Sequence, residues 1–309
     1  MTHALSAFIC FLCVKIIHYT LPFIMKKLFA LFTLAAIACT LCCAQPPQGW
    51  RMPKREKKIY SLSVGQVKME IDANNGARVL SLKHDTTEII SQLEMPNMYG
   101  STFWTSPQKV WNWPPVREID SNPYEVEEKD GAIIMTSGLS EKLPIRIIKK
   151  FEVDEKDNCF VVTYTMKNES NEDKQVAPWE ITRVLSRGSV FFDAPVEGIT
   201  PAGLMPFDKK NGYAWFDINH DETQNRKINS DGKGWLAYTD NGLLLVKRFQ
   251  DLTPSQPAPD EAEIQIYVHQ GNVYVELESQ GAYITLKPGE SSDWAVRWYL
   301  MPISENPFF

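Results

Sequence analysis

The sequence predicts an all-β protein, built as an antiparallel sandwich or barrel, and three observations support this. From Ile59 onward, apolar and polar residues alternate in short runs separated by turn-forming residues. No window of helical length carries a convincing period of 3.6 residues. The chain has 309 residues, of which 44% are hydrophobic, so it can bury one large core. Short strands at this spacing without helices are typical of sandwiches and barrels.

The strand runs follow one another along the chain, with turns between them. Residues 67–72 and 77–83 flank the turn sequence ANNG and therefore predict a hairpin. No internal repeat or second composition regime interrupts the pattern, so residues 59–309 are predicted to form one domain. The other runs that we expect to be strands are 131–137, 145–153, 158–168, 174–184, 234–238, 242–249, 262–268, 273–279, 282–286 and 292–300.

The first 44 residues are expected to be a secretory signal segment, removed before the protein folds. Met25 and two lysines form a short basic start, an apolar run follows, and small residues close it. Cleavage after Ala44 would leave Gln45 as the new terminus. We therefore expect a secreted or periplasmic protein with no membrane span in its mature chain.

Other interpretations of the leader stay open. Cys39 follows a loose lipobox, so processing as a lipoprotein at that residue is the alternative to cleavage after Ala44. Residues 1–24 are expected to be an extension ahead of the true start codon, and an uncleaved anchor over residues 4–44 is the other possibility. Residues 45–58 are rich in proline and then basic, which is typical of a linker.

Charge and composition exclude several function classes. The formal net charge of −6 argues against nucleic acid as the main partner, because phosphate binding needs a basic face. Five of the six cysteines lie in the leader and only Cys159 lies beyond it, so the mature chain has no internal disulfide. The histidines lack ligand spacing, and no nucleotide-binding or nucleophile motif is present. We expect no metal and no cofactor.

Three of the nine tryptophans lie in one proline-rich stretch, FWTSPQKVWNWPP, at residues 103–115. The prolines predict that this stretch is a loop between strands. Aromatic faces stack on the C–H faces of sugar rings, so the loop is a candidate saccharide platform. The alternative, given equal weight, is that these tryptophans fill the end of the sandwich core. The candidate residues of the loop are Trp104, Gln108, Trp111 and Trp113.

A pair of carboxylates is the strongest candidate for proton-transfer chemistry. In the strand run YVELES, Glu276 and Glu278 point to one face while Leu277 points to the other. If that face is partly covered, repulsion between the two carboxylates raises one pKa toward the range of a general base. An ordinary solvated strand face is the alternative, and it is common for paired glutamates.

The same stretch carries a family resemblance. LESQ, at residues 277–280, resembles the LETQ motif of the galactose mutarotases, or aldose 1-epimerases, whose glutamate is the catalytic base. The run NGARVLSLK at 75–83 is similar to that family's first hairpin. NESN at 168–171 followed by APWEIT, and the tail at 286–300, resemble two further family regions. The order and spacing match over nearly all of residues 59–303.

The resemblance implies a large antiparallel β-supersandwich with a sugar site on its concave face. It implies that Glu278 is the base and that Arg78 contacts the substrate. Family members use a histidine as general acid, whereas the corresponding stretch at 177–182 contains none. Glu180, beside an apolar tryptophan, and His269, whose loop leads to the strand of Glu278, are the replacement candidates. A buried, satisfied glutamate and an ordinary turn histidine are the alternatives.

Three functions remain in competition. The first is an isomerase that interconverts sugar anomers without a cofactor. The second is a saccharide-binding module without turnover, which the missing histidine favours. The third is a domain whose tryptophan loop docks a partner protein. The sequence favours carbohydrate as partner and leaves the oligomeric state open. The predicted substrate-binding residues are Arg78, Trp104, Gln108, Trp111, Trp113, Trp179, Tyr267 and Glu276.

Overall fold

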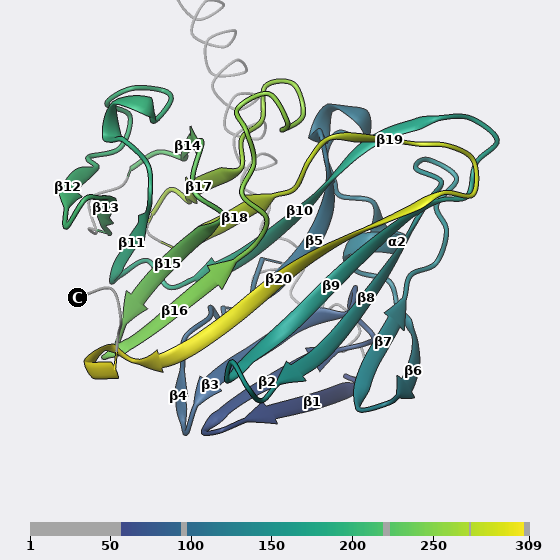
Figure 1. The fold of residues 1–309 in the computed structure, drawn as a ribbon, viewed down its shortest axis with the longest axis horizontal. Coiled ribbons are helices and arrows are strands. Elements are labelled where there is room, and N and C mark those ends of the chain that lie inside the picture. Colours follow the sequence, from purple (N-terminus) through teal and green to yellow (C-terminus); the bar gives the residue numbers. More distant parts are fainter. Residues whose placement is uncertain (1–56, 94–97, 219–222, 272, 306–309) are drawn as a thin grey trace, which may run out of the picture. The chain divides into compact units, whose positions relative to one another are not determined.

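The strands of the protein form two large sheets in which every pairing is antiparallel (Figure 1). The computed structural model describes residues 57–93, 98–218, 223–271 and 273–305. The predicted signal segment and its alternatives lie outside these residues, as does nearly all of the predicted linker. Within the described ranges, none of the helices has both the length and the apolar character needed to span a bilayer.

Each sheet contains ten strands. The first has the order β1 (Ile59–Val64), β2 (Val67–Asp72), β3 (Arg78–His84), β5 (Ser101–Ser106), β10 (Lys174–Val184), β18 (Val275–Gln280), β17 (Ile264–Val268) and β14 (Arg226–Ser230), with β4 (Thr87–Glu88) beside β3 and β19 (Ile284–Leu286) beside β10. The second has the order β12 (Asp208–Lys210), β13 (Tyr213–Asp217), β11 (Ser189–Phe192), β15 (Trp235–Asp240), β16 (Leu243–Arg248), β20 (Ser291–Pro302), β9 (Cys159–Asn168), β8 (Ile145–Asp154), β7 (Ala132–Thr136) and β6 (Glu125–Lys129).

Among the residues that the structure describes, helical structure is confined to single turns between and after the strands. The one α-helix of the described chain is α2 (Arg117–Asp120), which follows the tryptophan-rich stretch. The 3₁₀ turns are η1 (Gln108–Val110), η2 (Val196–Gly198) and η3 (Ile303–Glu305).

The main hydrophobic core lies between the two sheets. It is formed by alternate residues of strands from both sheets, as expected when each strand buries one face. Phe103 of β5 stacks on Tyr164 of β9 with ring centroids 4.5 Å apart, which joins the sheets near their centre. Figure 1 shows β16, β20, β9 and β8 running across the front of the molecule, with strands of the first sheet behind them. The predicted all-β fold of two antiparallel layers is confirmed.

Each predicted strand run contains a strand. The prediction that the whole stretch at 103–115 is a loop was wrong. Residues 101–106 form β5, which pairs with β10 along its whole length. Trp104 therefore lies in a central strand, and only the part after Ser106 is a loop. Apart from β5, none of the predicted runs covers β1, β4, β6, β11, β12, β13 or β14.

The predicted hairpin at the ANNG sequence is confirmed, and it supports α2. Gly76 has φ of +67°, a conformation that a side chain disfavours. A Cβ atom at this position would lie 2.0 Å from the carbonyl oxygen of Asp120, so the turn and the end of α2 are in close contact. This contact holds Asp120 over the strands β3 and β5.

Candidate functional site

Five neighbouring strands of the first sheet place polar and aromatic side chains on the face that points away from the second sheet. Glu278 of β18 lies opposite Ile181 of β10 and opposite Gln265 of β17. Directly opposed residues of an antiparallel pair project to the same face, whereas Leu277 projects to the core. The residues on this side, here called the Glu278 face, are Trp104, Trp179, Arg183, Lys227, Gln265, Tyr267, Glu276, Glu278 and Gln280.

Glu278 is buried, and only one of its carboxylate oxygens has hydrogen-bond partners. Its side chain is 1% exposed. Its Oε2 accepts hydrogen bonds from the Trp179 indole Nε1 and from the Lys227 Nζ, both at 2.8 Å. Its Oε1 has no partner among the described residues. Burial raises the pKa of Glu278 to about 7. The Lys227 cation lowers this pKa, and the negative charge of Glu276 raises it.

Lys227 contacts both Glu278 and the ring of Trp179. Its Nζ lies 4.6 Å from the centre of the Trp179 ring, so the ammonium sits over that ring while it pairs with Glu278. Its side chain is 34% exposed, in contrast to the buried carboxylate beneath it. Lys227 was not predicted, because the short run of β14 was not recognised as a strand.

A second ion pair lies beside the first. Arg183 Nη2 is 2.9 Å from Glu276 Oε1, and both side chains are buried. The Arg183 guanidinium also lies 5.7 Å from the ring of Trp104 and 5.9 Å from that of Tyr274. Glu276 is therefore paired with Arg183, whereas Glu278 keeps one oxygen without a partner among the described residues.

Asp120 fixes the aromatic end of the Glu278 face. Its Oδ1 accepts hydrogen bonds from Trp104 Nε1 at 2.8 Å, Thr102 Oγ1 at 3.1 Å and Arg78 Nη2 at 3.3 Å. Arg78 also donates to the carbonyl oxygen of Tyr99 at 2.8 Å, and its side chain is 0% exposed. Arg78 thus lies beneath Asp120 rather than at a ligand-accessible position, and its predicted substrate contact is not supported by this placement.

The tryptophans of the 103–115 stretch have different environments. Trp111 is buried and donates its Nε1 to the carbonyl oxygen of Thr105 at 2.8 Å. Trp113 is 57% exposed. Trp104 meets Trp179, Trp111 and Trp113 edge-on, with ring centroids 5.3, 5.7 and 6.2 Å away. Trp111 therefore packs in the core, which was the alternative to a role in sugar binding. Trp113 provides the exposed aromatic surface. Gln108 lies in η1, partly exposed.

Glu180 is on the opposite side of β10 from Glu278, so the structure does not bring these two residues together. Its Oε2 accepts a hydrogen bond from the Tyr164 hydroxyl at 2.6 Å, and its Oε1 pairs with Lys247 of the second sheet. The side chain is 0% exposed and lies in the core between the sheets. The prediction that Glu180 acts as an acid with Glu278 is withdrawn, because neighbouring residues of a strand face opposite sides.

His269 lies at the edge of the Glu278 face. Its ring is 4.8 Å from that of Tyr274 and 6.4 Å from that of Tyr267, and its Nδ1 contacts the carbonyl oxygen of Gln270 at 2.6 Å. Burial raises the pKa of Tyr267 to about 12, and the Glu276 charge adds to this effect. His269 therefore contacts the tyrosines that flank Glu276, and it makes no contact with Glu278.

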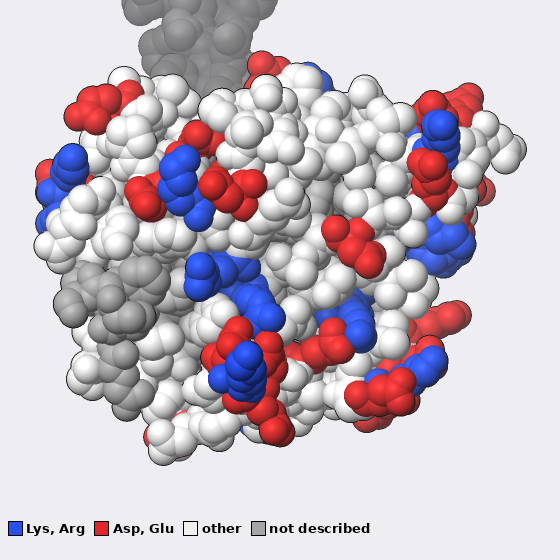
Figure 2. All heavy atoms as spheres, viewed as in Figure 1, with Lys and Arg blue, Asp and Glu red and all other residues white. Residues whose placement is uncertain are grey.

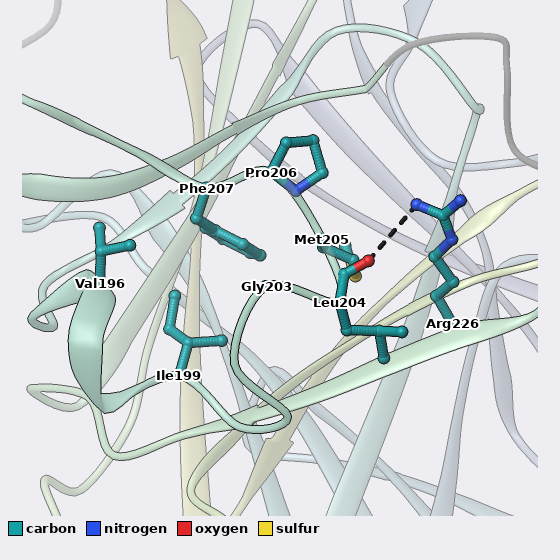
Figure 3. Close-up of a pocket in the computed structure, with 8 residues that line it drawn as sticks. All are labelled: Val196, Ile199, Gly203, Leu204, Met205, Pro206, Phe207 and Arg226. Carbon is teal, nitrogen blue, oxygen red and sulfur yellow. Dashed lines mark hydrogen bonds between the residues drawn. The ribbon is translucent and has the colours of Figure 1, made fainter.

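A pocket of about 450 Å³ lies elsewhere, around η2 and the start of β14 (Figure 3). Arg226 lines it and donates Nη1 to the carbonyl oxygen of Leu204 at 3.4 Å. Because Arg226 and Lys227 are adjacent in β14, their side chains project to opposite sides of the sheet. The pocket is therefore separate from the Glu278 face. Its lining is Val196, Ile199, Gly203, Leu204, Met205, Pro206, Phe207 and Arg226.

No group of three or more metal-ligating side chains occurs in the ranges that the structure covers. Figure 2 shows positive and negative side chains interspersed over the face on which the second sheet lies. Ion pairs such as Arg297 with Asp154, at 2.9 Å, and Lys150 with Glu152, at 2.7 Å, belong to strands of that sheet.

Solved structures with a similar fold include several mutarotase-like proteins. No family model matches the chain, and no curated protein matches it significantly. A candidate aldose 1-epimerase from Escherichia coli K12 is 15% identical, with 80% of this chain and 100% of that one covered and a TM-score of 0.59. A galactose mutarotase-like protein from Lactobacillus casei ATCC 334 is 13% identical over 79% and 100% of the two chains, with a TM-score of 0.56.

A third structure gives the same result. A galactose mutarotase-like protein from Clostridium acetobutylicum is 12% identical, covers 80% of this chain and 96% of its own, and has a TM-score of 0.53. At these identities the likeness shows the fold alone. The chain therefore has the galactose mutarotase-like β-sandwich fold, as the sequence resemblance implied.

Proposed function

We propose that this protein binds a sugar at the Glu278 face and interconverts its anomers, with Glu278 as the proton acceptor. The observation that carries this proposal is the Glu278 carboxylate. One of its oxygens is held by Trp179 and Lys227, and the other is buried without a partner among the described residues. Mutarotase-like proteins share the fold, which supports a sugar as the ligand.

Anomer exchange requires a base and an acid at the same end of a sugar ring. The base removes the proton of the anomeric hydroxyl, and the acid protonates the ring oxygen as the ring opens. A carboxyl group whose pKa is about 7 is divided between its two forms at neutral pH, so it can both take and return this proton. A solvated glutamate, ionised at this pH, would be a weaker base.

Aromatic residues supply the surface for the rest of the sugar. Trp113 is 57% exposed and meets Trp104 edge-on, so its free surface is available to the C–H face of a sugar ring. Trp104 and Trp179 are buried and form the wall between Trp113 and Glu278. This arrangement supports carbohydrate as the ligand class.

Binding without turnover is the second candidate. It is favoured by the positions of Glu180, which lies in the core, and of His269, which contacts Tyr274 rather than Glu278. Neither predicted acid is in contact with the carboxylate that would act as base.

The two candidates are separated by proton NMR exchange between the α and β anomers of several aldoses. We expect the protein to accelerate exchange, and Glu278→Gln to abolish the acceleration. Glu127→Gln, an exposed position of β6, is the matched control and is expected to retain it. Line broadening without acceleration would support binding alone. The absence of both effects for every sugar would contradict a sugar ligand.

Export is part of the same proposal. We propose that residues 1–44 direct the chain out of the cytoplasm and are removed after Ala44. N-terminal sequencing of the protein purified from its native host is expected to begin at Gln45. A lipid-modified terminus at Cys39, or a retained leader, would contradict this site of cleavage.

A further inference from the structure

We infer that Lys227 is the proton donor of the Glu278 site and takes the place of the histidine that residues 177–182 lack. This inference rests on the function proposed above. Its basis is a contact that the sequence did not reveal: the ammonium of Lys227 lies 2.8 Å from Glu278 Oε2, across the strands β14, β17 and β18.

The position of Lys227 places it on the ligand's approach to Glu278. Glu278 is 1% exposed, whereas the Lys227 side chain is 34% exposed, so Lys227 is the more solvent-accessible partner of the pair. The ammonium also lies 4.6 Å from the centre of the Trp179 ring. A sugar whose anomeric hydroxyl reaches Glu278 from solvent therefore meets the Lys227 N–H groups.

Other groups near Glu278 are poor candidates for the acid. The Trp179 indole N–H is a hydrogen-bond donor that does not dissociate. Arg183 pairs with Glu276 and its guanidinium is effectively never deprotonated. Tyr267, whose pKa burial raises to about 12, is a weaker acid than an ordinary phenol. Within the described chain, Lys227 is the dissociable donor that contacts Glu278.

The proposed reaction balances without any other reactant. The Glu278 carboxylate takes the proton of the anomeric hydroxyl while the Lys227 ammonium gives a proton to the ring oxygen. The bond between the anomeric carbon and the ring oxygen breaks, and the anomeric carbon becomes an aldehyde. After rotation of the aldehyde, the freed hydroxyl attacks its other side. That hydroxyl returns its proton to Lys227, and Glu278 returns its proton to the carbonyl oxygen.

The decisive variant is Lys227→Arg, because it separates charge from proton donation. Arginine keeps the positive charge and can pair with Glu278, but it does not release a proton. We expect kcat for anomer exchange to fall by about 10²- to 10⁴-fold, the usual contribution of a general acid, with KM close to the wild-type value. Lys129→Arg, on the exposed strand β6, is the matched control and is expected to keep full activity.

Chemical rescue gives a second readout that a purely structural lysine would not show. Methylammonium added to Lys227→Ala is expected to restore part of kcat, since it supplies the missing donor. The same addition to Glu278→Gln is expected to restore nothing.

The possible outcomes distinguish this inference from the function on which it rests. Full activity of Lys227→Arg, together with loss in Glu278→Gln, would overturn the role of Lys227 and leave Glu278 as the base. The alternative result is that Lys227→Ala lowers kcat/KM only by raising KM, with kcat unchanged and no rescue by methylammonium. That result would make Lys227 a binding residue and would also overturn the inference. A wild-type protein that does not accelerate exchange of any sugar would overturn both.

Discussion

At the scale of single residues, two buried glutamates of the first sheet differ in what surrounds them. Glu278 pairs with Lys227, which is partly open to solvent, and keeps one oxygen without a partner among the described residues. Glu180 pairs with Lys247 and Tyr164, both fully covered by the core. The first arrangement can exchange a proton with a ligand, whereas the second can only stabilise or destabilise the fold.

The activity is expected to depend on pH through Glu278. Burial raises the pKa of this carboxyl to about 7, and in the proposed mechanism the carboxylate is the active form. Below that pH the rate of anomer exchange should fall by roughly tenfold per pH unit, because the fraction of carboxylate falls in this proportion. NMR exchange rates measured from about pH 5 to pH 8 test this. A rate that stays constant over this range would show that Glu278 is not the base.

The core pair of Glu180 and Lys247 is expected to behave as a unit in unfolding experiments. Lys247→Met alone should lower the free energy of unfolding by about 3–5 kcal/mol, since it leaves a buried carboxylate without its cation. Glu180→Gln combined with Lys247→Met should recover most of this loss, because a neutral amide oxygen still accepts the Tyr164 hydroxyl. Urea denaturation of the two single variants and the double variant gives the coupling energy. Strictly additive losses would contradict the pairing.

The position of Glu180 could have been predicted from the sequence, because Trp179 and Glu180 are neighbours in a run that alternates. A strand cannot present both side chains to one ligand. The resemblance to a family motif at residues 177–182 led to the opposite expectation. The pair formed by Glu276 and Glu278 was predicted to share a face, and it does.

At the scale of elements, short segments position the Glu278 face. The single turn α2 brings Asp120 over β3 and β5, where it binds Arg78, Thr102 and Trp104. The turn between β2 and β3 provides the space, since Gly76 has no Cβ atom. The aromatic wall beside Glu278 therefore depends on a contact between two connections that are about forty residues apart in the chain.

Gly76→Ala is expected to destabilise the protein more than a glycine substitution at an open turn. Gly131→Ala is the matched control, because Gly131 also has a positive φ, of +79°, and a Cβ there has nothing within 4 Å. The control should cost roughly 1–2 kcal/mol, the penalty of the left-handed conformation. Gly76→Ala should cost about 1–3 kcal/mol more, because the new methyl group overlaps the Asp120 carbonyl. Equal unfolding free energies in urea would show that α2 can move away without cost.

The elements that carry the site were the hardest to predict. Strands with long alternating runs, such as β8, β9 and β18, were expected in the right places. β5 was missed because the stretch at 103–115 was predicted to be a loop on account of its prolines, and all of these prolines follow the strand. β14 was missed because RKINS is short and polar and its apolar side consists of Ile228 alone. The alternation of Lys227, Ile228 and Asn229 was the one signal that could have identified it.

At the scale of the whole molecule, Lys149 links the two sheets through the core. It extends from β8 and donates its Nζ to the carbonyl oxygen of Gly76 at 2.6 Å. The rings of Tyr124, Phe103 and Tyr164 lie 5.3 to 6.0 Å from this nitrogen. Burial lowers the pKa of Lys149 to about 7, an effect that the nearby Arg78 increases and the carboxylates of Asp120 and Glu180 oppose.

The free energy of unfolding is therefore expected to increase with pH because of Lys149. The unfolded chain holds this proton up to its ordinary pKa of 10.5, whereas the folded chain releases it near pH 7. Between these values the unfolded state binds more protons, so stability increases by up to about 1.4 kcal/mol per pH unit from this residue. Urea unfolding at several pH values, compared with Lys149→Met, isolates the contribution. Identical slopes in the two proteins would contradict a neutral Lys149 in the fold.

The strand order of the first sheet has a consequence for folding kinetics. The residues of the Glu278 face come from β5, β10, β14, β17 and β18, so the first and last of them are separated by more than half of the described chain. Such pairings have a high contact order, and they form only after large loops have closed. No short fragment of the chain can carry the site, and during refolding ligand affinity should return with the slowest phase rather than with the early collapse.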